Sequence, residues 1–477
     1  MKQVKVAVLL APVLLLFALG CSGRGPKSGY LDIRVDGVFE DWESVEPVYS
    51  APENSSGPVR EVRMADTPDR LFVRFDLDEE LLLQVDNDLA LHFDLDRDPV
   101  TGLEVGEIGA DYSWYFGRRE GVLRLPGREI PLNAYQAGLA AAPSVSSARF
   151  ELELARAPGE GGETEDLFSP EIAWVLTDDL FGRDEASFAA GTYRLQNRPP
   201  APYPAITLDR PEEPHFRLLS YNVLWDGLTL RAQPFNRILK ALDPDVIAFQ
   251  EIGAGTEEGT RGRVEEILNG EWYSARRKGC ITLSRFPILA AEAVDGNLAT
   301  LLDLSGGEGG KILLVNCHLP FGPNHQERTV EIDNLMAFLE SARDGKGPIP
   351  LREGTPIVVL GDMNLVGSSE HLRVLKQGRD GKPDWDGTPL ADLHPYHSAA
   401  PRSYTWQSPR RAGFGPSRLD YVFYTDSVIS PVKSFVLATD SMDPKSLKRH
   451  GLKRGDAVEA SDHYPVVVDF PLRPSAE

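Results

Sequence analysis

This chain has little cysteine and no excess of basic residues, and each of these features excludes a class of function. Only three of the 477 residues are cysteine, so nothing suits a zinc centre with Cys and His tetrads. Lys and Arg number 50 against 72 Asp and Glu, a formal net charge of -22. Of this charge, -16 lies in residues 1–200 and -6 in the remainder. A large basic surface that holds nucleic acid is therefore not expected.

Residues 1–20 predict an export signal and no part of the fold. A positively charged start precedes an apolar run at 6–19, which is shorter than a confident membrane span. The run ends in Ala-Leu-Gly-Cys21 and resembles the bacterial lipobox, although Ala18 stands where Leu is usual. The resemblance implies lipidation of Cys21 as the first mature residue. A plain secretory signal with a chance cysteine is the alternative.

The predicted location follows from this signal. Residues 21–29 are rich in Gly and Ser and predict a flexible tether. We expect an exported, membrane-anchored lipoprotein, periplasmic or on the outer membrane or cell surface. An exported protein can pair its remaining cysteines, Cys280 and Cys317. Both lie in apolar runs where a buried free thiol is common, so the disulfide stays open.

Residues 30–195 predict an antiparallel β-sandwich. Short alternating runs occur at 71–77, 89–95, 149–154 and 172–176, and Gly, Pro, Asp and Asn separate them. Many short strands without a long helical pattern are typical of such a domain. The segments 35–42, 93–102 and 109–115 resemble family 9-like carbohydrate-binding modules. That resemblance implies a glycan ligand.

Two further features of this domain have open interpretations. Asp94, Asp96 and Asp98 alternate before a Thr-Gly turn, and three oxygen donors at that spacing suit Ca²⁺. An acidic strand end is the alternative. The aromatic residues Trp42, Trp114 and Tyr115 suit either a core or a sugar-stacking platform, and tryptophan in a sandwich is more often core.

A Pro-rich segment at 196–214 predicts a semi-rigid linker to a second domain at 215–472. The central feature of this domain is the apolar run 357–360, which lies between Pro356 and Gly361 and is followed by Asp362 and Asn364. Such a run predicts a strand buried on both faces. Polar side chains just past a buried strand indicate a site, because buried charge is costly unless it is paired or binds metal.

Other predicted strands of this domain also carry polar residues at their ends. These polar residues are Asn222, Glu251, His318, Asp420, Asp462 and His463. In this order, these segments resemble the endonuclease/exonuclease/phosphatase superfamily, whose fold is deoxyribonuclease-I-like. The resemblance covers 215–472. It implies an α+β chain whose C-terminal domain is a four-layer α/β sandwich of two mixed sheets, preceded by the β-sandwich.

The resemblance also implies roles. Glu251 is the expected Mg²⁺ or Mn²⁺ ligand, with Asn222 and Asp462 near the metal. Asp362 and Asn364 face the water and the phosphate. Asp420 fixes the tautomer of His463, which is a general base or a clamp on the phosphate, while His318 contacts the phosphate. The residue types agree with this chemistry, because a phosphate ester needs charge neutralised and water positioned.

The predicted function is a metal-dependent phosphoesterase that acts on a phosphodiester or a phosphomonoester. An extracellular nuclease is narrowly preferred. A phospholipase C or sphingomyelinase type and an inositol-phosphate phosphatase are alternatives, because the superfamily shares these catalytic residues. The competing class is a glycan- or Ca²⁺-binding lipoprotein with an inactive enzyme-like domain. Both Glu251 and His463, which a relic usually loses, are present.

Overall fold

The computed structural model describes residues 29–472 apart from 56, 160–167, 179–188, 305–309, 323, 380 and 410–412. The expected signal at 1–20, the lipidation candidate Cys21 and all of the tether except residue 29 lie outside the described residues. Within the described ranges, no helix has both the length and the apolar character needed to cross a membrane.

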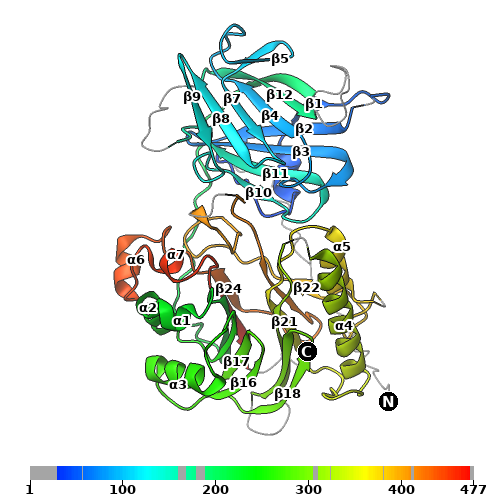
Figure 1. Ribbon diagram of the computed structural model, residues 1–477, viewed down its shortest axis with the longest axis vertical. Coiled ribbons are helices and arrows are strands. Elements are labelled where there is room, and N and C mark those ends of the chain that lie inside the picture. Colours follow the sequence, from blue (N-terminus) through cyan, green and yellow to red (C-terminus); the bar gives the residue numbers. More distant parts are fainter. Residues whose placement is uncertain are drawn as a thin grey trace, which may run out of the picture.

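The N-terminal part forms two antiparallel sheets (Figure 1). The first has the order β1 (Pro47–Ser50), β2 (Val59–Asp66), β3 (Arg70–Leu81), β11 (Ser147–Ala155), β10 (Ala140–Ala142). The second has the order β13 (Ala189–Arg194), β12 (Glu171–Asp178), β4 (Leu89–Asp94), β7 (Tyr112–Tyr115), β8 (Glu120–Leu125), β9 (Arg128–Leu132). One apolar core with side chains from both sheets joins them. The predicted antiparallel β-sandwich is confirmed.

A hairpin of β5 (Leu103–Val105) and β6 (Ile108–Ala110) and the 3-10 helix η1 (Glu40–Ser44) complete this domain. Trp42 and Trp114 are buried, and they serve as core residues. Tyr115 is partly exposed. Two of the three aromatic residues considered as a sugar platform are therefore inaccessible to a ligand.

The C-terminal domain contains two mixed sheets. The first has the order β16 (Tyr273–Arg277), β17 (Cys280–Ser284), β15 (Val246–Gln250), β14 (His215–Asn222), β25 (Val466–Pro471), β24 (Lys433–Val436). The second has the order β18 (Ile288–Val294), β19 (Asn297–Asp303), β20 (Lys311–His318), β21 (Ile357–Asp362), β23 (Asp420–Tyr424), β22 (Ala391–Asp392). The pairs β14–β15 and β20–β21 are parallel, and the other pairs are antiparallel.

Helices cover the outer faces of both sheets, which gives the predicted four layers (Figure 1). The helices are α1 (Gly227–Leu230), α2 (Ala232–Leu242), α3 (Glu257–Leu268), α4 (His325–Arg343), α5 (Ser369–Gln377), α6 (Pro444–Arg449) and α7 (Asp456–Ala460). Side chains of α2 and α3 share a core with the first sheet, and those of α4 and α5 share one with the second. A third core fills the space between the sheets.

Strand β21 shows why the sequence folds in this way. Ile357 and Val359 belong to the core under α4 and α5, whereas Val358 and Leu360 belong to the core between the sheets. Every residue of the strand is buried, and each of its four aliphatic side chains contributes roughly 1.5–3 kcal/mol on burial. The continuous apolar run therefore did mark a strand buried on both faces. Its carboxyl end carries Asp362 to the edge of the sheet.

The structure also shows the state of the two remaining cysteines and the contacts of the linker. Cys280 and Cys317 are buried free thiols and do not form a disulfide. The Pro-rich segment contacts both parts of the chain: Ala201 donates its backbone N–H to the carbonyl of Leu31, and the Tyr203 hydroxyl donates to the carbonyl of His397. The segment is therefore fixed by tertiary contacts in addition to the stiffness of its prolines.

Candidate active site

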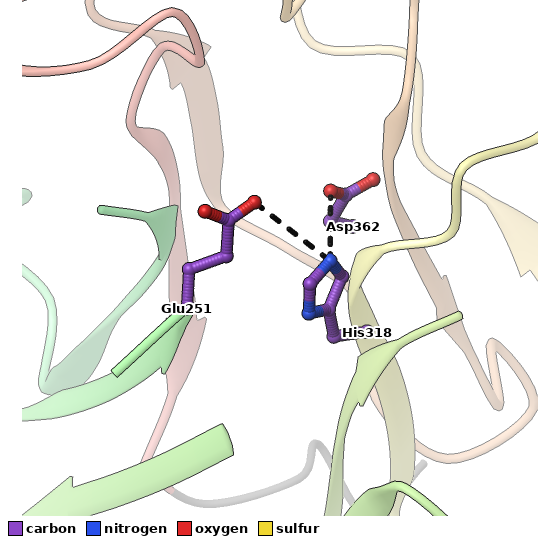
Figure 2. A group of neighbouring side chains, drawn as sticks. All are labelled: Glu251, His318 and Asp362. Carbon is purple, nitrogen blue, oxygen red and sulfur yellow. Dashed lines mark ion pairs between the residues drawn. The ribbon is translucent and has the colours of Figure 1, made fainter. Parts of the chain in front are cut away.

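The carboxyl ends of four strands meet at one edge of the C-terminal domain. Asn222 ends β14, Glu251 follows β15, His318 ends β20 and Asp362 ends β21. Parallel pairing places Asn222 opposite Gln250, next to Glu251, and His318 opposite Asp362. Because the sheets pack face to face, the two pairs confront each other across the interior. Figure 2 shows Glu251, His318 and Asp362 pointing toward a common point.

The amide of Asn222 links the two sheets at this point. Its Nδ2 donates to Asp362 Oδ2 at 2.9 Å and to Glu251 Oε1 at 3.0 Å. His318 Nε2 lies 3.6 Å from Asp362 Oδ2 and 3.9 Å from Glu251 Oε1. Asn222 and Asp362 are buried, whereas Glu251 and His318 are partly exposed. The cluster is thus anchored in the interior and open on the side of Glu251 and His318.

Asp420 and His463 form a buried dyad beside this cluster. His463 Nδ1 lies 2.8 Å from Asp420 Oδ2, and its Nε2 lies 3.5 Å from Asp362 Oδ2. Burial lowers the pKa of His463, but the charges of Asp420 and Asp362 and the hydrogen bond to Asp420 outweigh it and raise the pKa to about 10. This raised pKa favours the protonated imidazole, whose Nδ1–H donates to Asp420 Oδ2.

Strained backbone surrounds Glu251. Glu251 itself has φ 63°, and Leu224, Trp225 and Asp226 are also left-handed, with φ 48°, 49° and 57°. The Trp225 backbone N–H donates to Glu251 Oε2 at 2.9 Å. Asp226 accepts hydrogen bonds from the backbone N–H groups of Gly253 and Ala254. Non-Gly residues in this conformation cluster at functional sites and persist only where neighbours hold them.

Asn364 and Asp462 have other surroundings. Asn364 Nδ2 donates to the carbonyl of Leu319 at 3.0 Å, and its backbone N–H donates to Asp362 Oδ1 at 3.0 Å. This residue therefore ties the segment after His318 to the segment after Asp362. Asp462 is partly exposed, and its backbone carbonyl accepts from Gln407. Asp462 lies outside the group of carboxylate and imidazole atoms formed by Glu251, His318 and Asp362.

Two supporting residues were missed by sequence reasoning. The Thr405 hydroxyl accepts the backbone N–H groups of Leu419 and Asp420 at 3.0 and 2.9 Å. Asn297 Oδ1 accepts the backbone N–H of His318 at 2.9 Å. Both hold a site residue through its main chain. Their sequence neighbourhoods carry no signal of this role.

The donor set fits a hard divalent cation. The potential ligand atoms of Glu251, His318 and Asp362 lie within 4.8 Å of one another, and carboxylate oxygens are preferred by Mg²⁺ and Mn²⁺. Asn222 donates to both carboxylates, which lowers the cost of keeping two charges together. Glu251 and Asp362 would hold the ion, with His318 beside it.

The calcium prediction in the N-terminal domain requires one correction. The carboxylates that come within 4.8 Å of one another belong to Asp94, Asp96 and Asp111, and Asp98 is not among them. Strand pairing explains the change, because Phe93 of β4 lies opposite Tyr112 of β7 and brings Asp111 beside Asp94. Burial raises the pKa of Asp111 to about 6, and the charges of Asp96 and Asp94 add to the increase.

Part of the sequence is similar to a known protein family. The sequence model of the Endonuclease/Exonuclease/phosphatase family matches residues 219–463. No curated protein sequence matches the chain.

Many solved structures align with part of the chain, and three of them serve as examples. They are TDP2 of D. rerio complexed with single-strand DNA product (18% identity, 54% of this chain, 98% of that chain, TM-score 0.37), ANGEL2, a 2′,3′-cyclic phosphatase (17%, 54%, 95%, 0.37), and beta toxin from Staphylococcus aureus (16%, 53%, 99%, 0.34). Because the family model covers more than half of the sequence, the chain belongs to the endonuclease/exonuclease/phosphatase family and is a hydrolase of phosphate ester bonds.

Proposed function

We propose that the chain is a divalent-metal-dependent phosphoesterase that cleaves a phosphodiester by in-line attack of water. The observation that carries this proposal is the convergence of Glu251, His318 and Asp362 beside the Asp420–His463 dyad. A metal ion bound by the two carboxylates would act as a Lewis acid on the phosphate. The protein's own groups supply the remaining functions.

Asp362 Oδ2 is the central atom of the site. Three nitrogen atoms surround it: Asn222 Nδ2 at 2.9 Å, His463 Nε2 at 3.5 Å and His318 Nε2 at 3.6 Å. These contacts fix the orientation of the carboxylate, which would hold the metal ion and face the attacking water. His463, as a cation, would donate its Nε2–H to a non-bridging phosphate oxygen. Its raised pKa favours this clamp over the general-base role that the sequence left open.

Exposed aromatic side chains beside the site favour a nucleic acid substrate. Trp225 is 67% exposed while its backbone is bonded to Glu251, and Phe321 is 70% exposed three residues after His318. A base stacked on an aromatic ring gains about 1–3 kcal/mol. We therefore retain a nuclease as the first substrate class. Sphingomyelin and inositol phosphates are the alternatives for the same reaction.

The location and the role of the N-terminal domain belong to the same proposal. The positively charged start, the apolar run at 6–19 and the sequence ending in Cys21 support export and a lipid anchor. A cell-surface glycan ligand rests on the carbohydrate-binding-module resemblance alone. Radiolabelled fatty acid incorporation into wild type but not into Cys21→Ala would test the anchor.

The activity is tested with the chain from residue 22 on plasmid DNA, RNA, sphingomyelin, inositol phosphates and bis-p-nitrophenyl phosphate. Mg²⁺, Mn²⁺, Ca²⁺ and a chelator are compared. We expect metal-dependent turnover that is lost in Glu251→Ala and in His463→Ala. Glu258→Ala, an exposed change on α3, is the matched control and should keep full activity. A folded protein that hydrolyses none of these esters would overturn the proposal.

A further inference from the structure

The connection between β10 and β11, residues 143–146, leaves the β-sandwich and enters the core of the C-terminal domain. Val145 is only 4% exposed. It belongs to the apolar cluster of Met363, Leu365 and Leu375, under α4 and α5, and to no cluster of its own domain. In Figure 1, β10 lies at the end of the sandwich that faces the C-terminal domain. A side chain of the accessory domain thus completes the core behind β21.

Main-chain bonds fix this connection to the loop that follows Asn364. Val145 forms an isolated parallel β-bridge with Gly367, and Ser146 N–H donates to the carbonyl of Gly367 at 2.6 Å. Ser369 N–H donates to Ser146 Oγ at 2.9 Å. Gly367 cannot carry a side chain here, because its φ is +126° and a Cβ would lie 2.3 Å from the His325 imidazole. The loop is therefore shaped to receive residues 144–146.

The hydroxyl of Ser144 spans two loops that carry site residues. Its single proton is shared between the carbonyl of Leu365 at 3.2 Å and the carbonyl of Arg418 at 3.1 Å. Leu365 directly follows Asn364, and Arg418 precedes Asp420 by two residues. The hydroxyl gives both carbonyls a donor in a partly buried position, so it restrains the spacing of the two loops.

A second contact of the same domain holds the far end of the Asp420 loop. The Tyr135 hydroxyl accepts the backbone N–H of Ser408 at 2.6 Å and donates to the carbonyl of Phe414 at 3.2 Å. Gln407, next to Ser408, donates its N–H to the carbonyl of Asp462, beside His463. Contacts from the sandwich therefore reach both partners of the dyad through the main chain.

We propose that Ser144 is a positioning residue of the active site, which sets the distance between the Asn364 loop and the Asp420 loop. The N-terminal domain is by this argument a structural part of the catalytic unit. The inference rests on the proposed phosphoesterase function for its catalytic consequence. Its structural consequence, restraint of two loops by one hydroxyl from another domain, can be measured without turnover.

The test compares wild type with Ser144→Ala, Ser144→Thr and Ser147→Ala in the full mature chain. Ser147 is the matched control, because its hydroxyl bonds only within the sandwich, to Arg149. Hydrogen–deuterium exchange is followed in peptides covering 361–369 and 413–421. Loss of one shared hydrogen bond should raise exchange in both peptides by roughly three- to tenfold. The strands β15 and β20 should not change.

The catalytic readout is kcat and KM on bis-p-nitrophenyl phosphate. We expect Ser144→Ala to lower kcat with KM and the thermal midpoint little changed, and Ser144→Thr, which keeps the hydroxyl, to restore both kcat and protection. Unchanged exchange in both peptides would overturn the inference. So would a uniform rise in exchange with a fall in the thermal midpoint, because that marks general destabilisation. If wild type hydrolyses no ester while Ser144→Ala still loosens the two loops, the proposed function fails and the positioning role stands.

Discussion

Replacing Asp420 by Asn should remove most of the shift in the pKa of His463. The carboxylate lies 2.8 Å from His463 Nδ1, and both side chains are buried. Two unit charges ~4 Å apart attract by about 4 kcal/mol at an effective dielectric constant of ~20. At about 1.36 kcal/mol per pKa unit, this is about three units. The pKa of His463 should therefore fall from about 10 to about 7.

The sign of the stability change follows from the same values. In wild type, the folded protein keeps the His463 proton above pH 6.5, where the unfolded chain loses it. The contribution of this proton to the free energy of unfolding is complete below pH 6.5 and is lost as the pH rises toward 10. In Asp420→Asn the free energy of unfolding should no longer depend on the His463 proton above about pH 7. The rate should fall by about 10²–10⁴, as when the partner of a catalytic histidine loses its charge.

The assay is an NMR titration of the histidine Hε1 signals in metal-free buffer. The His463 signal is assigned by its absence in His463→Gln. Urea unfolding between pH 6 and pH 10 gives the linked stability. A His463 pKa in Asp420→Asn that stays within one unit of the wild-type value would refute the assignment of Asp420 as the main cause.

Three other predictions concern metal binding, a buried ion pair and acid stability. Glu251→Gln should abolish the rise in thermal midpoint that Mg²⁺ or Mn²⁺ gives wild type, since the ion loses a carboxylate; an equal rise in both proteins would contradict the metal site. Arg217→Met should lower the free energy of unfolding in urea by about 3–5 kcal/mol, because Asp469, 0% exposed, loses its bidentate partner. Arg217→Met with Asp469→Leu should recover much of this loss. Burial lowers the pKa of both His92 and His397 to about 4. Between pH 6.5 and pH 4 the unfolded chain protonates these histidines and the folded chain does not, so each should lower the free energy of unfolding by up to about 3 kcal/mol as the pH falls. His397→Gln should reduce the dependence of the free energy of unfolding on pH in this range. An unchanged dependence would show that His397 titrates normally.

The locally encoded parts of the fold were predictable. The apolar run 357–360 marked β21 because each of its side chains meets a core on one face or the other. The ends of the predicted strands also marked Asn222, Glu251, His318 and Asp362, since parallel strands bring their carboxyl ends to one edge. Here the sequence pattern and the tertiary arrangement express the same physical constraint.

Contacts between distant segments were not predictable. Asp111 joins Asp94 and Asp96 only through the register of β4 and β7. Thr405 acts on Asp420 through main-chain hydrogen bonds, which leave no residue pattern. Val145 is one apolar residue in a polar turn, and nothing near it shows that it packs in another domain. Each case depends on a tertiary contact that no local residue pattern records.

The pairing of β25 with β14 has a consequence for the order in which activity appears. β25, near the end of the chain, lies between β14 and β24 in the first sheet of the C-terminal domain. Its Phe470 is paired with Phe216 on the adjacent strand β14. The strand that carries Asn222 therefore has β15 on one side but lacks its second neighbour until Val466–Pro471 has been synthesised. Such long-range pairing forms slowly, because the intervening loop must close first. We therefore expect a chain clipped after β24 to have no hydrolase activity, because it lacks both β25 and His463.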